Sequence, residues 1–323
     1  ANTTGGGNIA IGSGALDANT TAIHNVGVGT NALGGNTTGT ANVALGHRAL
    51  LTNTTASNNT AVGYDALKLN TIGFNNTAVG SLCLDAMVSG DYNVAMGTLA
   101  LTTDASGNKT TAIGYGALYN QNPASGADVF NTAVGYAAGS EVTTGVQNTF
   151  VGADAGDATT TGGYNTAVGK DALGANTTGG HNVAVGRPAL KSNTTANNNV
   201  SVGNETLNAN TTGTQNVAVG HAALLANTTA SSNTAVGYYA LLANTTGTQN
   251  VALGTTAMDA NTTGYNNTAL GYDSLSANTT TNNNTAVGTN VLRASTGSNN
   301  TGLGTNAGLS VTTGSNNVLI GYT

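Results

Sequence analysis

Residues that could perform nucleophilic, acid–base or metal chemistry are few in this chain and stand far apart. Its 323 residues include one Cys, Cys83, and no base near it in the sequence would activate a thiolate. A small buried apolar residue is therefore the expected role of Cys83. A metal site needs three or four convergent ligands, whereas the histidines are dispersed along the chain. They are His24, His47, His181 and His221.

The acidic residues form no recognisable catalytic constellation either. Hydrolysis of a glycoside needs two carboxylates that face each other across a cleft, and the sequence spacing indicates no such pair. A Ser/His/Asp arrangement and a phosphate-binding G-x-x-x-x-G-K-[ST] loop are also missing from the sequence. We therefore expect that the chain is not an enzyme and that it binds no cofactor and no metal.

The composition excludes further classes of function. Lys and Arg total 7 and the net charge is −6, so the basic stripe needed for nucleic-acid binding is lacking. No run of about 18 apolar residues is present, which argues against membrane insertion. Only 6% of the residues are charged, whereas Gly alone supplies 47 positions. Order in such a chain has to come from a repeated pattern.

A repeat of 17 residues runs from one end of the sequence to the other. The word Asn-Thr/Val-Ala-Val/Ile/Leu-Gly recurs, and its final Gly serves as position 0 of each repeat. The spacing is 17 throughout, except for 21 residues between Gly114 and Gly135 and 16 between Gly288 and Gly304. The glycines at position 0 are Gly12, Gly29, Gly46, Gly63, Gly80, Gly97, Gly114, Gly135, Gly152, Gly169, Gly186, Gly203, Gly220, Gly237, Gly254, Gly271, Gly288, Gly304 and Gly321.

The consensus G-x-x-A-L-x-x-N-T-T-G-x-x-N-T-A-V predicts an all-β fold. Asn-Thr-Ala-Val alternates with period 2 and favours a strand, and Ala-Leu can form a second one. Asn-Thr-Thr-Gly favours a turn, because Asn and Gly tolerate positive φ. Two strands and two turns make one coil of a parallel β-solenoid, or β-roll, of about 19 coils. We expect a single array over residues 1–323, with an insertion at 115–135 and a one-residue deletion in the C-terminal coils at 289–323.

The positions of charged residues predict which way each position faces. Charges occur mostly at +1, +2, +5 and +12, which should face water, whereas Leu at +4, Thr or Val at +14, an aliphatic residue at +16 and two Ala should face inward. So thin a core suggests that further burial comes from oligomerisation through the Ala and Thr faces. Asn at +7 and +13 should stack along the array and satisfy turn backbone. Representative structural residues are Gly63, Gly135, Gly237, Leu67, Leu241, Asn70 and Asn244.

Tyrosines concentrate at one position that should be exposed. Six of the 11 Tyr lie at +1, where aromatic and polar groups would share one edge, as in a carbohydrate- or protein-binding face. Covering the turn and stacking between coils is the alternative role. The members are Tyr64, Tyr115, Tyr136, Tyr238, Tyr272 and Tyr322.

The longest repeat is a second candidate for contact with a receptor. Insertions in solenoids emerge as surface loops, often on the binding face. In the same region Gly139 and Gly156 replace Leu at +4. The segment could be a receptor-contact loop, a kink or a neutral bulge. Its candidate contact residues are Tyr119, Asn122, Pro123 and Asp128.

The repeat words resemble those of two known groups of proteins. The segments 59–63, 131–135 and 284–288, all Asn-Thr-Ala-Val-Gly, are similar to the repeat of trimeric autotransporter adhesin heads. The longer word, complete in 237–254, resembles arrays in bacteriophage tail-fibre proteins. The resemblance implies a left-handed coil, three chains to a bundle, and a place outside the cell or on a virion surface.

These observations predict a structural and adhesive fibre: a shaft or head segment of a tail fibre or surface adhesin. Its partners would be copies of itself, most simply as a homotrimer, and a glycan or protein of a host-cell surface. Two alternatives remain open. The chain could be the subunit of a self-assembling extracellular filament, or an ice-binding solenoid whose Thr ladders match an ice lattice.

Overall fold

The computed structural model describes residues 2–322, which contain nineteen three-residue β-strands and no helix. The chain divides into two compact units, one ending at Tyr164 and one beginning at Asn165. The strands of the first unit are β1 (Ile9–Ile11), β2 (Val26–Val28), β3 (Val43–Leu45), β4 (Thr60–Val62), β5 (Thr77–Val79), β6 (Val94–Met96), β7 (Thr111–Ile113), β8 (Thr132–Val134) and β9 (Thr149–Val151). The strands of the second are β10 (Thr166–Val168), β11 (Val183–Val185), β12 (Val200–Val202), β13 (Val217–Val219), β14 (Thr234–Val236), β15 (Val251–Leu253), β16 (Thr268–Leu270), β17 (Thr285–Val287), β18 (Thr301–Leu303) and β19 (Val318–Ile320).

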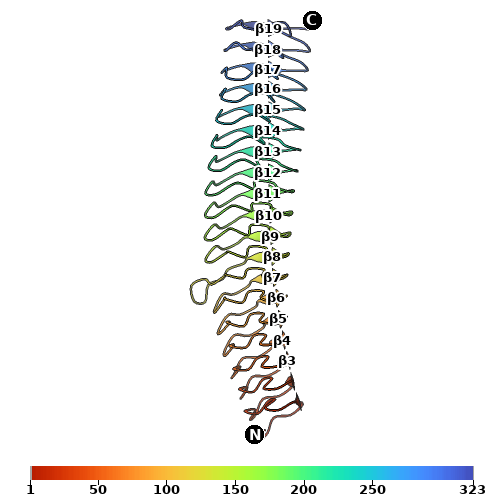
Figure 1. Cartoon of the computed structure of the whole chain (residues 1–323), viewed down its shortest axis with the longest axis vertical. Helices are drawn as coiled ribbons and strands as arrows, with labels where there is room; N and C mark the ends of the chain where they lie inside the picture. The colour runs from red at the N-terminus through yellow and green to blue at the C-terminus, as the bar shows by residue number, and fades with distance from the viewer. Residues whose placement is uncertain (1, 323) are drawn as a thin grey trace. The chain divides into compact units, whose positions relative to one another are not determined.

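Within each unit, every strand pairs in parallel with the strand of the next repeat (Figure 1). The register is one repeat: Thr60 lies opposite Thr77, and Val62 opposite Val79. Equivalent positions therefore stack directly on one another along the sheet. The predicted all-β parallel solenoid with a 17-residue period is confirmed.

The prediction of a second strand in each coil is wrong. The Ala-Leu segment is a turn, and its leucines adopt left-handed backbone, with φ 50° at Leu67 and 53° at Leu241. Left-handed φ also occurs at positions 0, +2 and +12, but not in the Asn-Thr-Thr-Gly turn, where we expected it. Bonds between coils hold the strained turn in place, because the Leu67 N–H donates to the Cys83 carbonyl at 2.9 Å.

The inward-facing set also differs from the prediction at positions +14 and +16. Each strand is three residues long, so alternation turns only its middle residue inward. Ala78 is fully buried, whereas Thr77 and Val79 on either side of it are partly exposed on the outer face. The coil interior consists mainly of Leu at +4 with Ala at +3 and +15, such as Leu67 and Ala66.

Two ladders of buried asparagine support the turns. At +7, the Asn70 side-chain N–H donates to Oδ1 of Asn53 and to the Gly73 carbonyl, both at 2.9 Å. At +13, the Asn59 side chain donates to the same Gly73 carbonyl at 2.8 Å, and its Oδ1 accepts the Asn76 backbone N–H at 2.9 Å. The amide supplies donors and acceptors without a charge, so the backbone is satisfied inside a narrow coil.

The two irregular repeats differ in length at the same turn. The four extra residues emerge between Asn122 and Asp128, as a loop that projects at the level of β6 and β7 (Figure 1). The deletion shortens the turn between Ser295 and Gly297. The registers of β7 with β8 and of β17 with β18 are unaffected. This corner of the coil therefore tolerates changes in length.

Gly139 and Gly156 lack a leucine because an aromatic ring occupies its space. Phe150 stands where other repeats have Ala, at the middle of β9, and it is fully buried. A Cβ on Gly156 would lie 2.5 Å from the Phe150 ring, and one on Gly139 would lie 2.7 Å from it. The replacement of Leu by Gly at these two +4 positions therefore makes room in the core for the larger side chain of Phe150.

Candidate functional site

The tyrosines at +1 are exposed, and some of them stack on an aromatic ring at +1 of a neighbouring coil. Their exposed fractions range from 48% at Tyr238 to 82% at Tyr322. Tyr115 stacks on Tyr136 of the next coil, with ring centroids 5.4 Å apart, and Tyr238 stacks on His221 of the preceding coil, also at 5.4 Å. The remaining members, Tyr64, Tyr272 and Tyr322, are exposed as well. Much of this row is therefore engaged in stacking between neighbouring coils.

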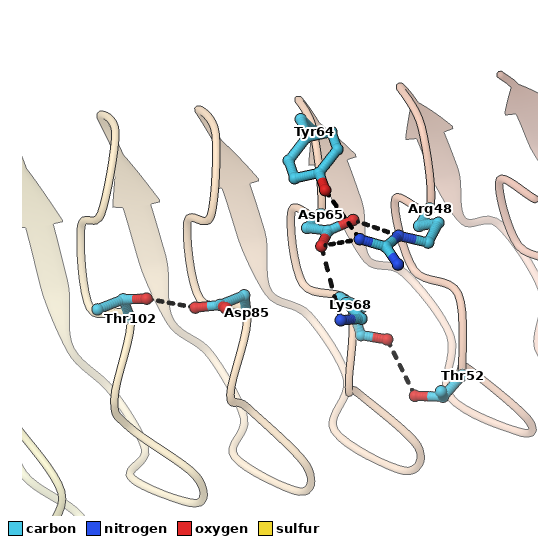
Figure 2. Close-up of polar contacts among 7 residues, drawn as sticks. All are labelled: Arg48, Thr52, Tyr64, Asp65, Lys68, Asp85 and Thr102. Carbon is cyan, nitrogen blue, oxygen red and sulfur yellow. Dashed lines mark hydrogen bonds and ion pairs between the residues drawn. The ribbon is translucent and has the colours of Figure 1, made fainter. Parts of the chain in front are cut away.

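Position +2 is not uniformly water-facing, contrary to the prediction. Asp65 is 3% exposed and pairs with both Arg48 and Lys68 (Figure 2). Arg48 donates to both of its carboxylate oxygens, at 2.8 and 2.6 Å, and also to the Tyr64 hydroxyl at 2.9 Å. The bond to Asp65 raises the pKa of Arg48, and Lys68 Nζ lies 3.6 Å from the same carboxylate. In the second unit, Asp273 is 8% exposed and pairs with Arg293 at 2.5 Å.

These clusters connect coils to one another. Arg48 and Asp65 lie one repeat apart, and Figure 2 shows the guanidinium reaching from its own coil to the next. In the same view the Thr102 hydroxyl donates to the Asp85 carboxylate, again across one repeat. The Asp65 carboxylate is paired with a cation on two sides. This arrangement therefore has a structural role.

Cys83 has no feature of a reactive thiol. It is fully buried, and its Sγ donates to the Ala95 carbonyl at 3.2 Å. Burial raises the pKa of the thiol to about 12. Within residues 2–322, no three His, Cys, Asp or Glu side chains gather in a way that could hold a metal ion. In the same range, no helix offers the length and apolar character needed to cross a membrane.

A buried polar network replaces the asparagine ladder next to the insertion. Asp104 and Gln121 occupy two successive +7 positions, and both are fully buried. The Gln121 side-chain N–H donates to Asp104 at 2.7 Å, and Asn131 donates to the Gln121 carbonyl oxygen at 2.9 Å. Burial raises the pKa of Asp104, although Gln121 and two backbone N–H groups lower it in part. The network anchors the base of the inserted loop.

The loop presents most, but not all, of the residues expected there. Tyr119 is 38% exposed, and Asn122 and Asp128 are exposed. Pro123 is buried, so it cannot serve as an exposed contact residue, and the expectation for it is wrong. Asp128 accepts from Lys109 Nζ at 2.6 Å, and that bond lowers its pKa.

Sequence reasoning missed an aromatic surface beside this loop, formed by Phe74, Tyr92, Lys109 and Phe130 in four successive coils of the first unit. We call it the aromatic edge. Phe74 and Tyr92 meet edge to face at 5.4 Å, and Lys109 Nζ lies 5.1 Å from the centre of the Phe130 ring. The available signal was the occurrence of two of the three Phe of the chain at +11 and +12, where other repeats carry mostly polar residues.

Comparisons of the chain with protein-family models, with curated proteins and with solved structures find no match. The architecture therefore rests on the geometry of the chain itself. Its parallel β-solenoid units with a 17-residue period are built from Asn-, Thr- and Val-rich repeats.

Proposed function

We propose that the chain is a structural segment of a homo-oligomeric fibre, with copies packed through the outer face of the sheet. The single observation that supports this most strongly is the composition of that face. Within residues 2–322, its side chains at +14 and +16 are all Thr, Val, Ile, Leu or Met. They are partly exposed, as at Val43, Leu45 and Leu253. Parallel sheets are ordinarily covered on both faces.

The size of the face suits an interface between chains. Nine strands in the first unit, with two outward side chains each, present 18 side chains, and the ten strands of the second unit present 20. A standard protein–protein interface involves about 20–30 residues on each side. A contiguous apolar surface of this extent marks an interaction site.

The resemblance of the repeats adds finer detail to the proposal. It favours a left-handed coil, a homotrimer, and a place outside the cell or on a virion surface, where the fibre would contact a host-cell glycan or protein. The segment would act without chemical catalysis, through stiffness and through the contacts that its exposed edges make.

Light scattering after size exclusion tests the proposal on the full chain. We expect a discrete mass of about three 31.5 kDa chains. The double variant Val185→Glu/Val219→Glu places charges on the outer face and should dissociate the assembly. The control, Thr195→Glu/Thr229→Glu, adds the same charges at exposed +9 turns and should leave the mass unchanged. A wild-type monomer would refute the assembly.

The two alternatives predict other outcomes of the same experiment. A polydisperse series of large masses would favour a filament that grows head to tail. A monomer would leave the flat outer face open to an ice lattice, and thermal hysteresis would then test that function. Among residues 2–322, ten strands begin with Thr but none ends with Thr, so the paired Thr rows expected of an ice-binding face are incomplete.

A further inference from the structure

We infer that the aromatic edge is a binding site for a neutral hexopyranose polysaccharide. This inference deepens the proposed function, on which it rests, by giving the cell-surface contact a place and a chemical class. The site consists of Phe74, Tyr92, Lys109 and Phe130 together with Asp128 of the inserted loop.

The first argument is that these side chains are exposed without being needed by the fold. Phe74, Tyr92 and Phe130 are 38%, 53% and 49% exposed, in a chain that has three Phe in all and no Trp. The third Phe, Phe150, is fully buried in the core. Neighbouring repeats fold with polar residues at the same positions, such as Ser57 at +11.

The second argument is the backbone conformation at +12. Tyr92, Lys109 and Phe130 have φ of 59°, 60° and 55°. Left-handed backbone disfavours large side chains and favours Asn, which many other repeats carry here, including Asn58 and Asn75. Three successive coils thus depart from the residue that the backbone prefers. Such departures concentrate at functional sites.

The third argument concerns the chemistry of the edge. The CH faces of a pyranose ring are apolar and stack on aromatic rings, and its hydroxyls need donors and acceptors beside those rings. Three of four successive coils supply a ring, and parallel stacking sets neighbouring coils about 4.8 Å apart. The Asp128 side chain is 45% exposed, the Lys109 side chain is 41% exposed, and the Asn108 amide lies at the same corner.

The fourth argument excludes other ligands. Lys109 and Asp128 neutralise each other at 2.6 Å, and Asp91 is the further charge at this corner, so an anionic ligand has no excess of positive charge to meet. A peptide that adds a strand needs unpaired backbone. Here the Tyr92 N–H donates to the Phe74 carbonyl at 3.2 Å, and the Lys109 N–H donates to the Asp91 carbonyl at 3.0 Å.

Affinity electrophoresis of the full chain in native gels that contain dextran, mannan or galactan tests the inference. The wild-type chain should be slowed by at least one of these neutral polysaccharides. The triple variant Phe74→Ser/Tyr92→Asn/Phe130→Asn installs residues that other repeats carry. It should bind about tenfold more weakly or worse, as the loss of central aromatic contacts predicts. Because Asn suits left-handed backbone, this variant should keep its circular dichroism spectrum and its mass.

A matched control is available in a coil of the edge itself. Leu69 and Ile72 are 42% and 59% exposed in the repeat that carries Phe74. The variant Leu69→Ala/Ile72→Thr, which also installs residues of other repeats, should be slowed as much as the wild type.

Three results would overturn the inference: no slowing of the wild type by any of the three polysaccharides, equal slowing of the triple variant, or loss of binding in Tyr115→Ser/Tyr136→Ser instead. Light scattering on the same samples keeps the two proposals apart. A trimer that binds no polysaccharide refutes the glycan site alone, and a monomer that binds one refutes the assembly alone.

Discussion

The core around Phe150 gives a quantitative test of how neighbouring coils share space. Phe150→Ala removes a fully buried ring between two positions that lack side chains, so no neighbour can fill the cavity. Large-to-small changes of this kind destabilise by about 3–5 kcal/mol. Gly156→Leu alone restores the consensus residue, but its Cβ would lie 2.5 Å from the ring. Overpacking should destabilise it by about 1–3 kcal/mol or more.

The combination of changes is the informative experiment. In Phe150→Ala/Gly139→Leu/Gly156→Leu the three positions carry the residues of an ordinary repeat, whose leucines adopt the same left-handed φ as these glycines. We expect the triple variant to lie within about 1.5 kcal/mol of the wild type, because its Ala and Leu side chains would pack as they do in the ordinary repeats, where Ala78, Leu67 and Leu84 are fully buried. The changes should therefore be strongly non-additive, as contacting residues are.

Hydrogen–deuterium exchange of the β8 and β9 amides is the appropriate assay, because repeat arrays open locally rather than as one unit. A loss of 3–5 kcal/mol corresponds to exchange faster by about two to three and a half powers of ten. The β4 amides, several coils away, should exchange at the wild-type rate in every variant. If the β8 and β9 amides of the triple variant exchanged as fast as those of Phe150→Ala, Phe150 would not be occupying the space of the two missing leucines.

Three further outcomes follow from the buried polar groups. Asn70 Oδ1 is buried without a hydrogen-bond partner because Met87 interrupts the ladder. Met87→Asn should therefore stabilise these coils by about 1 kcal/mol in thermal unfolding. An unfolding midpoint below that of the wild type would contradict the stabilising role of the asparagine ladder. Burial raises the pKa of Asp104 above its unfolded value, so the folded chain binds that proton more tightly. Local stability should fall as the pH rises from the unfolded towards the folded pKa, and amide exchange corrected for its intrinsic rate should show more protection in mildly acidic than in neutral buffer. Arg48→Met removes the closest cation from the buried Asp65 carboxylate, and faster exchange in β3 and β4 is the expected result.

The structural residues that the repeat indicated occupy well-defined places in the coil. Leu67 is fully buried at the centre of its coil, and Asn70 lies in the ladder at +7. Gly237 has φ 139°, and a Cβ there would lie 2.5 Å from the Gly254 carbonyl oxygen of the next coil. These roles could be predicted because a residue type that recurs at one position of every repeat has to suit contact with its own copies.

Features that depend on a single repeat were harder to predict. Phe150 fills the space of two leucines in neighbouring coils, so neither Gly139 nor Gly156 could be understood from its own repeat. The burial of Asp65 depends on Arg48 one coil away. The aromatic edge was missed because its residues differ in type and occupy both +11 and +12, so no single position shows an aromatic consensus.

The sequence by itself determined the period, the stacking register and the residues that meet their own copies. A 17-residue repeat requires equivalent positions to contact one another, and three-residue strands such as Thr77–Val79 follow from its one stretch of alternating side chains. Only the tertiary structure decided the path of the coil between strands: which residues take left-handed φ, and that Thr77 and Val79 face outward while Ala78 faces inward. The physical reason is that a repeat specifies which residues stack, whereas the direction of each side chain depends on how the whole coil closes around its narrow core.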